Sequence, residues 1–167
     1  MDDIGVTCCF TGHRIAKLPW RDNENDPRCV ALKEKLAAVV EAVYQSGVRR
    51  FICGMANGCD MYFAETVLEL REAHPEISLE AAIPFDGQSL RWNKDLRTRY
   101  ERILSQCDYE TLVQHEHSPD CMMRRNRYMV DSSSVVVACY DGMPGGTMNT
   151  LLYAMRQNKE VIQLPVE

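Results

Sequence analysis

Short apolar runs rich in β-branched residues alternate along the chain with longer segments in which apolar residues recur at helical spacing. The clearest run covers residues 135–138, where three valines precede an alanine. This pattern is typical of a strand buried on both faces. After a loop with several glycines, helical spacing predicts a helix that begins near Gly146 or Thr147. Its apolar positions are Met148, Leu151, Leu152 and Met155.

The remaining segments repeat this alternation of strand and helix. Further strands are predicted over residues 4–10, 50–53, 78–83, 110–113 and 161–164. Helices are predicted from the Asp26-Pro27 cap to Gly47, from the turn ending at Asp60 to before Pro75, around residues 96–104, and from the Ser118-Pro119 cap onward. No repeat or linker-like stretch divides the chain. The pattern therefore predicts one α/β domain over residues 1–167, with a mainly parallel sheet and right-handed crossovers.

Composition and charge limit the classes of function. With 167 residues, 46% hydrophobic and 26% charged, the chain has the size and make-up of one soluble globular domain. The net charge of -5 argues against a protein that coats nucleic acid or an anionic membrane, although it leaves room for a local basic pocket. A small-molecule partner is therefore expected, whereas nucleic acid and membranes are not.

The cysteines and the absence of long apolar runs bear on the cellular compartment in which the protein is expected. No apolar run approaches the roughly 20 residues of a membrane-spanning helix, and the N-terminus lacks a secretory signal pattern. The chain has 8 cysteines but no C-x-x-C motif, and Cys8, Cys53 and Cys139 lie in apolar strand-like runs. Four disulfides are the alternative on count alone, but buried free thiols in a reducing cytoplasm are the favoured interpretation. A cytoplasmic protein is expected.

Glycine-bearing turns follow three of the predicted strands. These glycines are Gly12 after the first strand, Gly54 and Gly58 after the second, and Gly142, Gly145 and Gly146 after the strand at 135–138. Because the carboxyl ends of parallel strands share one edge of a sheet, the turns are expected to form a common anion or nucleotide site there. The helix N-terminus near residue 146 adds unpaired N–H groups and a positive dipole end, which suit a phosphate. The turns match neither G-x-G-x-x-G nor the Walker pattern, and tight turns without a ligand remain the alternative.

Side chains beside these turns supply the candidate ligand contacts. Arg14 and Arg125 are the strongest, because a guanidinium binds phosphate oxygens in a bidentate fork; a surface ion pair is their alternative role. Asp60 caps its helix or bonds a ribose hydroxyl, and Asn57 holds its own turn or contacts the ligand. The full predicted ligand-binding set is Gly12, His13, Arg14, Gly54, Ala56, Asn57, Gly58, Asp60, Arg125, Asp141, Gly145, Gly146, Thr147 and Asn149.

Three further polar residues each keep more than one interpretation. His13 donates to a phosphate, acts as an acid or base, or is simply a polar surface residue. Thr147 and Asn149 lie in the first turn of the last helix, where they donate to phosphate or cap the helix. No metal site is predicted, because no second ligand pair of the usual spacing accompanies His115, His117 and Cys121.

Three stretches of the sequence resemble one protein family. They are TGHR after the first strand, GMANGCDMYFAE after the second, and MMRRNRYMVDSSSVVVACYDGMPGGTMNT near the end. Together they are similar to the YpsA-like proteins of the SLOG superfamily, in the same order over nearly the whole chain. That superfamily includes the lonely-guy-type phosphoribohydrolases, which cleave cytokinin nucleotides, and the DprA-like DNA-processing proteins. The resemblance implies a single-domain Rossmann-like three-layer sandwich with a pocket for a nucleotide or nucleotide-derived ligand, and is compatible with a homo-oligomer.

The phosphoribohydrolase motif can be compared residue by residue. Its M-x-x-R-K-x-x-M helix matches the spacing of Met122, Arg125 and Met129, so Arg125 resembles the functional arginine of that family. Residues 144–147 resemble a shortened form of its P-G-G-x-G-T-x-x-E loop. However, Asn149 and Thr150 stand where the carboxylates of that motif belong. A carboxylate is needed to stabilise the cation-like sugar formed when an N-glycosidic bond breaks.

The missing carboxylate leaves the function open among three classes. We expect a sensor or binding module that holds a nucleotide or nucleotide-derived small molecule at the carboxyl edge of the sheet. A nucleotide-processing N-glycoside hydrolase with a displaced acid is one alternative, and a DNA-handling or protein-interaction module is another. No cofactor is assigned beyond a nucleotide-type ligand. If a reaction occurs, the catalytic candidates are Arg125, Glu65 and His13, with Asp60 and Asp141 as further substitutes for the acid.

Overall fold

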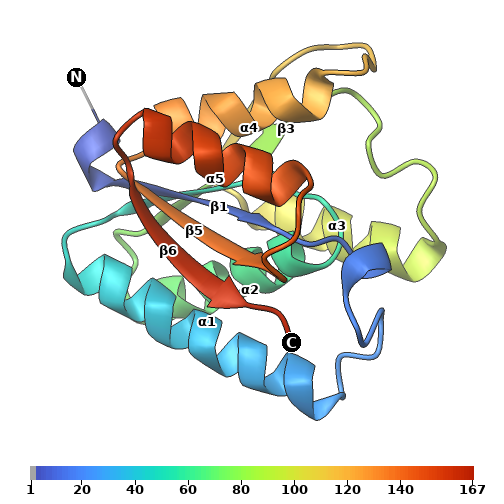
Figure 1. The fold of residues 1–167 in the computed structure, drawn as a ribbon, viewed down its shortest axis with the longest axis horizontal. Helices are drawn as coiled ribbons and strands as arrows, with labels where there is room; N and C mark the ends of the chain where they lie inside the picture. The colour runs from blue at the N-terminus through green and yellow to red at the C-terminus, as the bar shows by residue number, and fades with distance from the viewer. Residues whose placement is uncertain (1–2) are drawn as a thin grey trace.

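The computed structural model describes residues 3–167, which form one sheet flanked by helices. The sheet has six strands in the order β4-β3-β2-β1-β5-β6, and each described pairing is parallel (Figure 1). This arrangement confirms the predicted Rossmann-like α/β fold. The strands are β1 (Thr7–Gly12), β2 (Arg50–Cys53), β3 (Ser78–Ile83), β4 (Tyr109–Leu112), β5 (Val135–Tyr140) and β6 (Glu160–Pro165).

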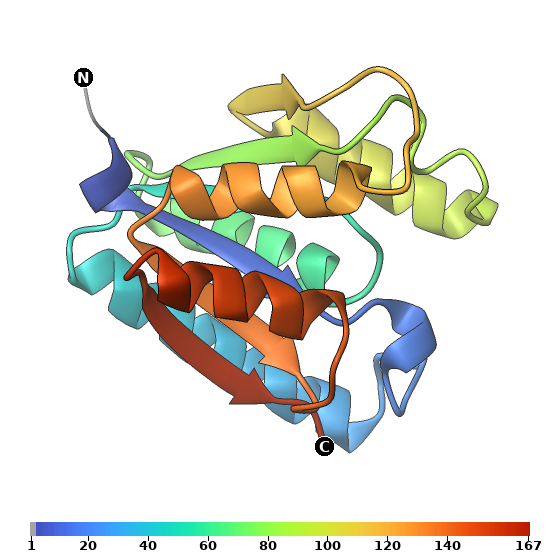
Figure 2. The ribbon, with the colours of Figure 1, turned by 45° about the horizontal axis from the view of Figure 1, so that its top comes forward.

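Helices cover both faces of the sheet and make three layers. The first three α-helices pack on one face, and the last two lie side by side on the other (Figures 1 and 2). The helices are α1 (Pro27–Gln45), α2 (Cys59–Ala73), α3 (Lys94–Gln106), α4 (Cys121–Asp131) and α5 (Gly146–Arg156), with short 3-10 turns η1 (Ile4–Val6) and η2 (Ile15–Lys17). None of the described helices is long and apolar enough to cross a bilayer.

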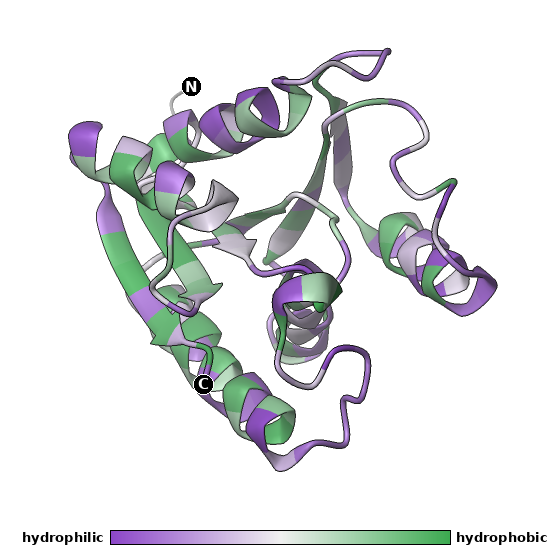
Figure 3. Ribbon diagram, turned by 45° about the vertical axis from the view of Figure 1, so that its right-hand side comes forward, coloured by the Kyte–Doolittle hydropathy of each residue, from purple (hydrophilic) through white to green (hydrophobic). Residues whose placement is uncertain are grey.

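Two apolar clusters fill the space between the layers. Alternate residues of a strand point to opposite faces, so Phe10 packs toward α1–α3 while Cys9 packs toward α4 and α5. In the larger cluster Phe10 stacks on Phe63, with ring centroids 4.7 Å apart. The sheet strands are accordingly mostly hydrophobic in Figure 3, whereas the connecting loops are largely hydrophilic. All eight cysteines are free and all but Cys107 are buried, which confirms the prediction of buried free thiols.

Several predicted boundaries differ from the structure, and three elements show this most clearly. Strand β1 begins at Thr7 rather than at residue 4, because residues 4–6 form η1 and pairing with β2 starts only at Thr7. Helix α4 begins at Cys121 rather than at the predicted Ser118-Pro119 cap. There the Ser118 carbonyl accepts from Cys121 N in a separate turn, and the Ser118 hydroxyl donates to Asp120. Strand β4 starts and ends one residue before the predicted range 110–113.

The order of the strands creates a crevice beside β1. From β1 the chain adds β2, β3 and β4 on one side, then returns through α4 to place β5 on the other side of β1. The connections after β1 and β5 therefore run to opposite faces of the sheet, which is the topological switch point where ligands bind in open parallel sheets. Because β2, β1 and β5 are adjacent, the three glycine turns lie along one edge, as predicted.

Candidate ligand-binding site

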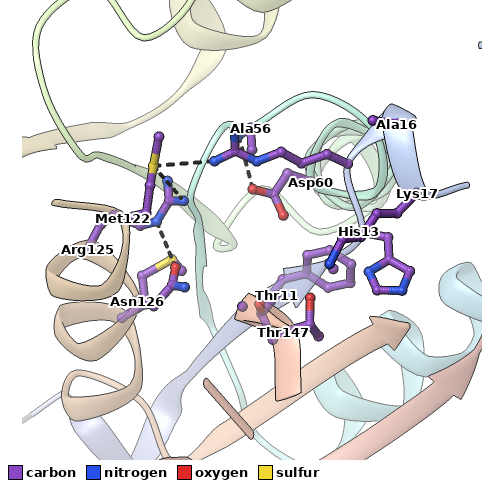
Figure 4. A pocket seen from close by; sticks show the side chains of 15 residues that line it. Thr11, His13, Ala16, Lys17, Ala56, Asp60, Met122, Arg125, Asn126 and Thr147 are labelled. Carbon is purple, nitrogen blue, oxygen red and sulfur yellow. Dashed lines mark hydrogen bonds between the residues drawn. The ribbon is translucent and has the colours of Figure 1, made fainter. Parts of the chain in front are cut away.

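A pocket of about 250 Å³ opens at this switch point, between the N-termini of α2 and α5 and the side of α4 (Figure 4). Its floor is the end of β1 at Thr11 and Gly12, and η2 closes one side. The structure brings together most of the predicted site residues from four separate parts of the chain. Those that line the pocket are Gly12, His13, Arg14, Ala56, Asp60, Arg125, Gly146 and Thr147.

Two arginines form one wall of the pocket. Arg125, on α4, is 4% exposed, and its Nη1 donates to the carbonyl oxygens of Gly54 and Ala82. Within residues 3–167 its Nη2 reaches only the Met122 sulfur, at 3.8 Å, and Arg14 Nη2 donates to the same sulfur at 3.3 Å. A thioether is a weak acceptor, so two guanidinium groups share a partner that neutralises neither. Burial lowers the pKa of Arg125, whereas the negative charge of Asp60 raises it.

Asp60 places a carboxylate inside the same pocket. It lies in the first turn of α2, where one of its oxygens accepts from Ala56 N at 3.0 Å. It is 5% exposed, and burial raises the pKa of its carboxyl, while the Arg125 charge, the Ala56 N–H and Arg14 act in the opposite direction. Asp60 therefore holds the turn before α2 rather than capping the helix, which has no side-chain cap bond, and its other oxygen has no partner among the described residues.

The opposite wall is the start of α5 with a lysine beside it. Thr147 is 7% exposed, and its hydroxyl bonds to no other residue in the described range. Lys17, on η2, likewise has no ion pair there, and its Nζ approaches the α5 N-terminus so closely that a β-carbon at Gly145 would lie 2.7 Å from it. A helix N-terminus, a hydroxyl and an ammonium group thus surround one side of the pocket.

A chain of amide and hydroxyl groups connects the two walls. Asn126 accepts from Arg125 Nε at 2.8 Å and donates to the Thr150 hydroxyl at 2.9 Å. That hydroxyl in turn donates to the Gly146 carbonyl at 2.9 Å. Thr150 occupies one of the positions where the phosphoribohydrolase motif has carboxylates. Through Asn126 it fixes the position of Arg125 relative to the start of α5.

The glycines before α2 are closely packed and do not line the pocket. A β-carbon at Gly54 would fall 2.5 Å from Arg125 Nη1, so this glycine leaves room for the guanidinium. Gly58 has φ +85° and lies against the His13 carbonyl, which accepts from Cys59 N at 3.1 Å. These contacts fix the loop after β1 to the start of α2, and so fix Asp60 relative to Arg14.

His13 is a buried connector between strand and loop. It is 4% exposed, its backbone N donates to Cys139 O at 3.0 Å, and its Nε2 accepts from Asp141 N at 3.2 Å. The Asp141 carboxylate is 3.1 Å from the same nitrogen, and the Met143 N–H and His13 lower the pKa of Asp141. Asp141 itself is exposed and lies outside the pocket lining.

Other predicted residues lie away from the pocket. Asn57 Oδ1 accepts from Ile15 N at 3.0 Å and so holds the loop after β1. Asn149 is exposed on α5. Glu65 forms an ion pair with Arg99, and Arg99 also binds Glu24, so this carboxylate is not beside the pocket. Asp60 is therefore the carboxylate of the pocket lining among the described residues, and these residues include no group of His, Cys, Asp and Glu that would hold a metal.

Sequence reasoning missed Lys17, Thr11 and Asn126 as pocket residues. Lys17 comes three residues after Arg14 in the same loop, and this spacing was the available signal. Thr11 directly precedes Gly12 in β1, and Asn126 directly follows Arg125. Nothing in their residue types alone distinguishes them from ordinary surface positions.

Comparison with known proteins agrees with this architecture. The YpsA family model, described as a YspA SLOG family, matches residues 8–167. The uncharacterised SPbeta prophage-derived protein YoqJ of Bacillus subtilis is 36% identical over 144 residues, which cover 78% of this chain and 84% of YoqJ. A UPF0398 protein of Bacillus thuringiensis is 29% identical over 156 residues, which cover 90% of this chain and 83% of that protein.

Two solved structures of DNA processing protein A, DprA, share the fold. The Streptococcus pneumoniae protein has a TM-score of 0.64 and 14% identity over 98% of this chain, which spans about half, 51%, of that protein. The Helicobacter pylori protein has a TM-score of 0.66 and 16% identity, covering 99% of this chain and 67% of its own. The latter structure is described as giving insight into the single-stranded DNA binding mode of that protein.

These neighbours correct one expectation. The net charge of -5 was the ground for not expecting nucleic acid as a partner, yet the same fold occurs in a protein with a single-stranded DNA binding mode. Net charge sums over the whole surface, whereas binding depends on the local field. Here Arg14, Lys17 and Arg125 gather at one pocket of an acidic chain, so the exclusion of nucleic acid is wrong.

Proposed function

Because the chain belongs to the YpsA family of SLOG proteins, we propose that its switch-point pocket binds a nucleotide or nucleotide-derived small molecule and that the protein is a sensor or binding module. The observation that carries this proposal is the set of polar groups in the pocket that no described residue satisfies. They are the Thr11 and Thr147 hydroxyls, Lys17 Nζ and one oxygen of Asp60.

The chemistry of these groups fits a phosphorylated sugar. A phosphate at the N-terminus of α5 would accept from backbone N–H groups, the Thr147 hydroxyl and Lys17. The Asp60 carboxylate accepts hydrogen bonds and repels anions, so it suits the hydroxyl groups of a ribose rather than a phosphate. A binding module is favoured over a hydrolase, because Asn149 and Thr150 stand where the phosphoribohydrolase motif has its carboxylates.

A segment of single-stranded nucleic acid is a second candidate ligand. The observation that favours it is an open groove of about 900 Å³ that shares Arg14 and Ala16 with the pocket. A polynucleotide with one phosphate in the pocket would have room to continue along this groove. The shared fold with a protein described by its single-stranded DNA binding mode supports the same idea.

Calorimetric titration with AMP, adenosine and a short single-stranded oligonucleotide tests the proposal. AMP is expected to bind and adenosine to bind at least tenfold more weakly, because adenosine lacks the phosphate. The Lys17→Met variant should weaken AMP binding about tenfold, the typical effect of removing one charge-assisted contact. Lys35→Met, an exposed lysine of α1, is the matched control and should leave the affinity unchanged.

Three results would contradict parts of this proposal. Failure of both AMP and the oligonucleotide to bind at millimolar concentration would remove the nucleotide function. Binding of the oligonucleotide alone would replace the small-molecule ligand with nucleic acid. Steady release of free adenine from AMP, followed by chromatography, would show an N-glycoside hydrolase instead of a binding module.

A further inference from the structure

The cations of the pocket lie in two separate groups. Lys17 stands beside the N-terminus of α5, whereas Arg14 and Arg125 meet at the Met122 sulfur near α4. In Figure 4, Asp60 lies between Lys17 on one side and Met122 and Arg125 on the other. Building on the proposed nucleotide function, we infer that the pocket contains two phosphate subsites, and that its ligand is a nucleotide with phosphates on two different positions of one sugar.

The first subsite is the start of α5. Helix α5 directs its N-terminal N–H groups at the pocket, as many helices do without binding a ligand. What marks this N-terminus as a binding site is the Thr147 side chain, which is more than nine-tenths buried, lines the pocket and has no partner in the described part of the chain. Lys17 adds a full positive charge at the same end of the pocket.

The second subsite is defined by the two guanidinium groups. Like charges are normally kept apart or bridged by an acid. Both guanidinium groups lie in the field of the Asp60 carboxylate, but the acceptor that they share is the neutral Met122 thioether. The Arg125 residue is 4% exposed, and its Nη2 has no oxygen acceptor among residues 3–167, although Nη1 donates to the Gly54 carbonyl and Nε to Asn126. An anion bound between the two guanidinium groups would supply the missing acceptor and relieve their repulsion.

The carboxylate between the subsites restricts what connects the two phosphates. Two adjacent phosphates of a diphosphate would bring negative charge onto Asp60, whereas a sugar would present hydroxyl donors to it. A pocket of about 250 Å³ has room for a phosphorylated sugar, with the base extending into the open groove beyond Arg14 and Ala16. The ligand class is therefore a nucleoside bisphosphate rather than a nucleoside diphosphate.

Three ligands, titrated at constant ionic strength, distinguish one phosphate subsite from two and adjacent phosphates from phosphates separated by a sugar. AMP has one phosphate, ADP has two adjacent phosphates, and adenosine 3′,5′-bisphosphate has two phosphates separated by the ribose. The bisphosphate is expected to bind at least tenfold more tightly than AMP, and ADP is expected to stay close to AMP. ADP carries as many phosphates as the bisphosphate, so it controls for the number of phosphate groups.

Variants at the two subsites give the second part of the test. Arg14→Met removes an exposed side chain that donates to the Met122 sulfur, so the fold should be retained. Arg14→Met is expected to reduce the advantage of the bisphosphate over AMP from tenfold or more to about one, whereas Lys17→Met should weaken both ligands alike and leave that advantage in place. Arg124→Met, on the exposed side of α4, is the matched control and should keep that advantage.

The outcomes distinguish this inference from the proposed function. If none of the three probes binds, the nucleotide function itself fails. If AMP binds but the bisphosphate binds no more tightly, the two-subsite inference alone is overturned. If ADP binds more tightly than AMP by the same factor as the bisphosphate does, the claim that a sugar separates the two phosphates is wrong. If Arg14→Met still binds the bisphosphate more tightly than AMP, the claim of a second subsite is wrong.

Discussion

Replacement of Gly58 by alanine is expected to destabilise the protein by about 3 kcal/mol, a large effect for the addition of one methyl group. Gly58 has φ +85° and ψ -129°, a backbone conformation that side-chain-bearing residues rarely adopt. A β-carbon there would also lie 2.7 Å from the His13 carbonyl oxygen and 2.8 Å from Ile15 N. Both of those atoms belong to the backbone, so neither can rotate away.

Gly142→Ala is the matched control for this substitution. Gly142 has nearly the same φ, +83°, but no atom lies within 4 Å of a β-carbon placed there. The variant should therefore show the conformational cost alone, about 1 kcal/mol. Urea denaturation followed by circular dichroism measures both variants. Equal losses in the two proteins would show that the contact between the loop after β1 and the start of α2 does not constrain residue 58.

Replacement of Arg125 by methionine is expected to have the largest effect, with a loss of about 3–5 kcal/mol at pH 7. Methionine retains much of the side-chain volume but leaves the Gly54 and Ala82 carbonyls without this donor. It also leaves the Asp60 carboxylate, which is 5% exposed, without its principal neighbouring cation. A buried charge deprived of its counter-charge costs more than the pair contributed.

The pH dependence of this loss identifies its cause. Burial already raises the folded-state pKa of Asp60, and removal of Arg125 raises it further because the cation lowers it. For a carboxyl with a raised folded pKa, stability falls as pH rises from the unfolded pKa through the folded one. The deficit of Arg125→Met should thus be greatest at neutral pH and shrink on acidification. A deficit independent of pH would show that the lost hydrogen bonds, and not Asp60, account for it.

The Arg125→Met/Asp60→Asn double variant completes this experiment. With the carboxylate replaced by a neutral amide, no buried charge remains unpaired, so the double variant should be more stable than Arg125→Met alone at pH 7. Arg124→Met is the control for loss of a surface cation from the same helix, and its unfolding free energy should scarcely change.

The fold was accessible from the sequence because strand and helix patterns are local. The apolar run at 135–138 and the proline-capped start of α1 are set by residues close together in the chain, and both appear where they were predicted. The α4 boundary failed for an equally local reason. Ser118 and Asp120 bond to each other in a turn that resembles a helix cap in sequence but precedes the helix.

The site was only partly accessible because its contacts are remote in sequence. That Arg14 and Asp60 face one pocket follows from the strand order, which no local pattern encodes. Asn57 and Glu65 have side chains that could contact a ligand. However, Asn57 accepts a hydrogen bond from the Ile15 backbone N, and Glu65 is paired with Arg99. Lys17 escaped prediction because its importance comes from its proximity to the start of α5, 129 positions along the chain from it.

The free cysteines allow local unfolding of individual strands to be measured without introducing a label. Strands β1, β2 and β5 each carry buried thiols, and burial raises the pKa of Cys9 to about 12. A thiol that is shielded and protonated reacts slowly with alkylating reagents, so its modification requires that its strand become transiently exposed. Mass-spectrometric labelling rates would therefore rank the strands by opening free energy, with the partly exposed Cys107 as the internal reference. A ligand that joins α4 to α5 across the crevice should slow the labelling of Cys139 at the end of β5.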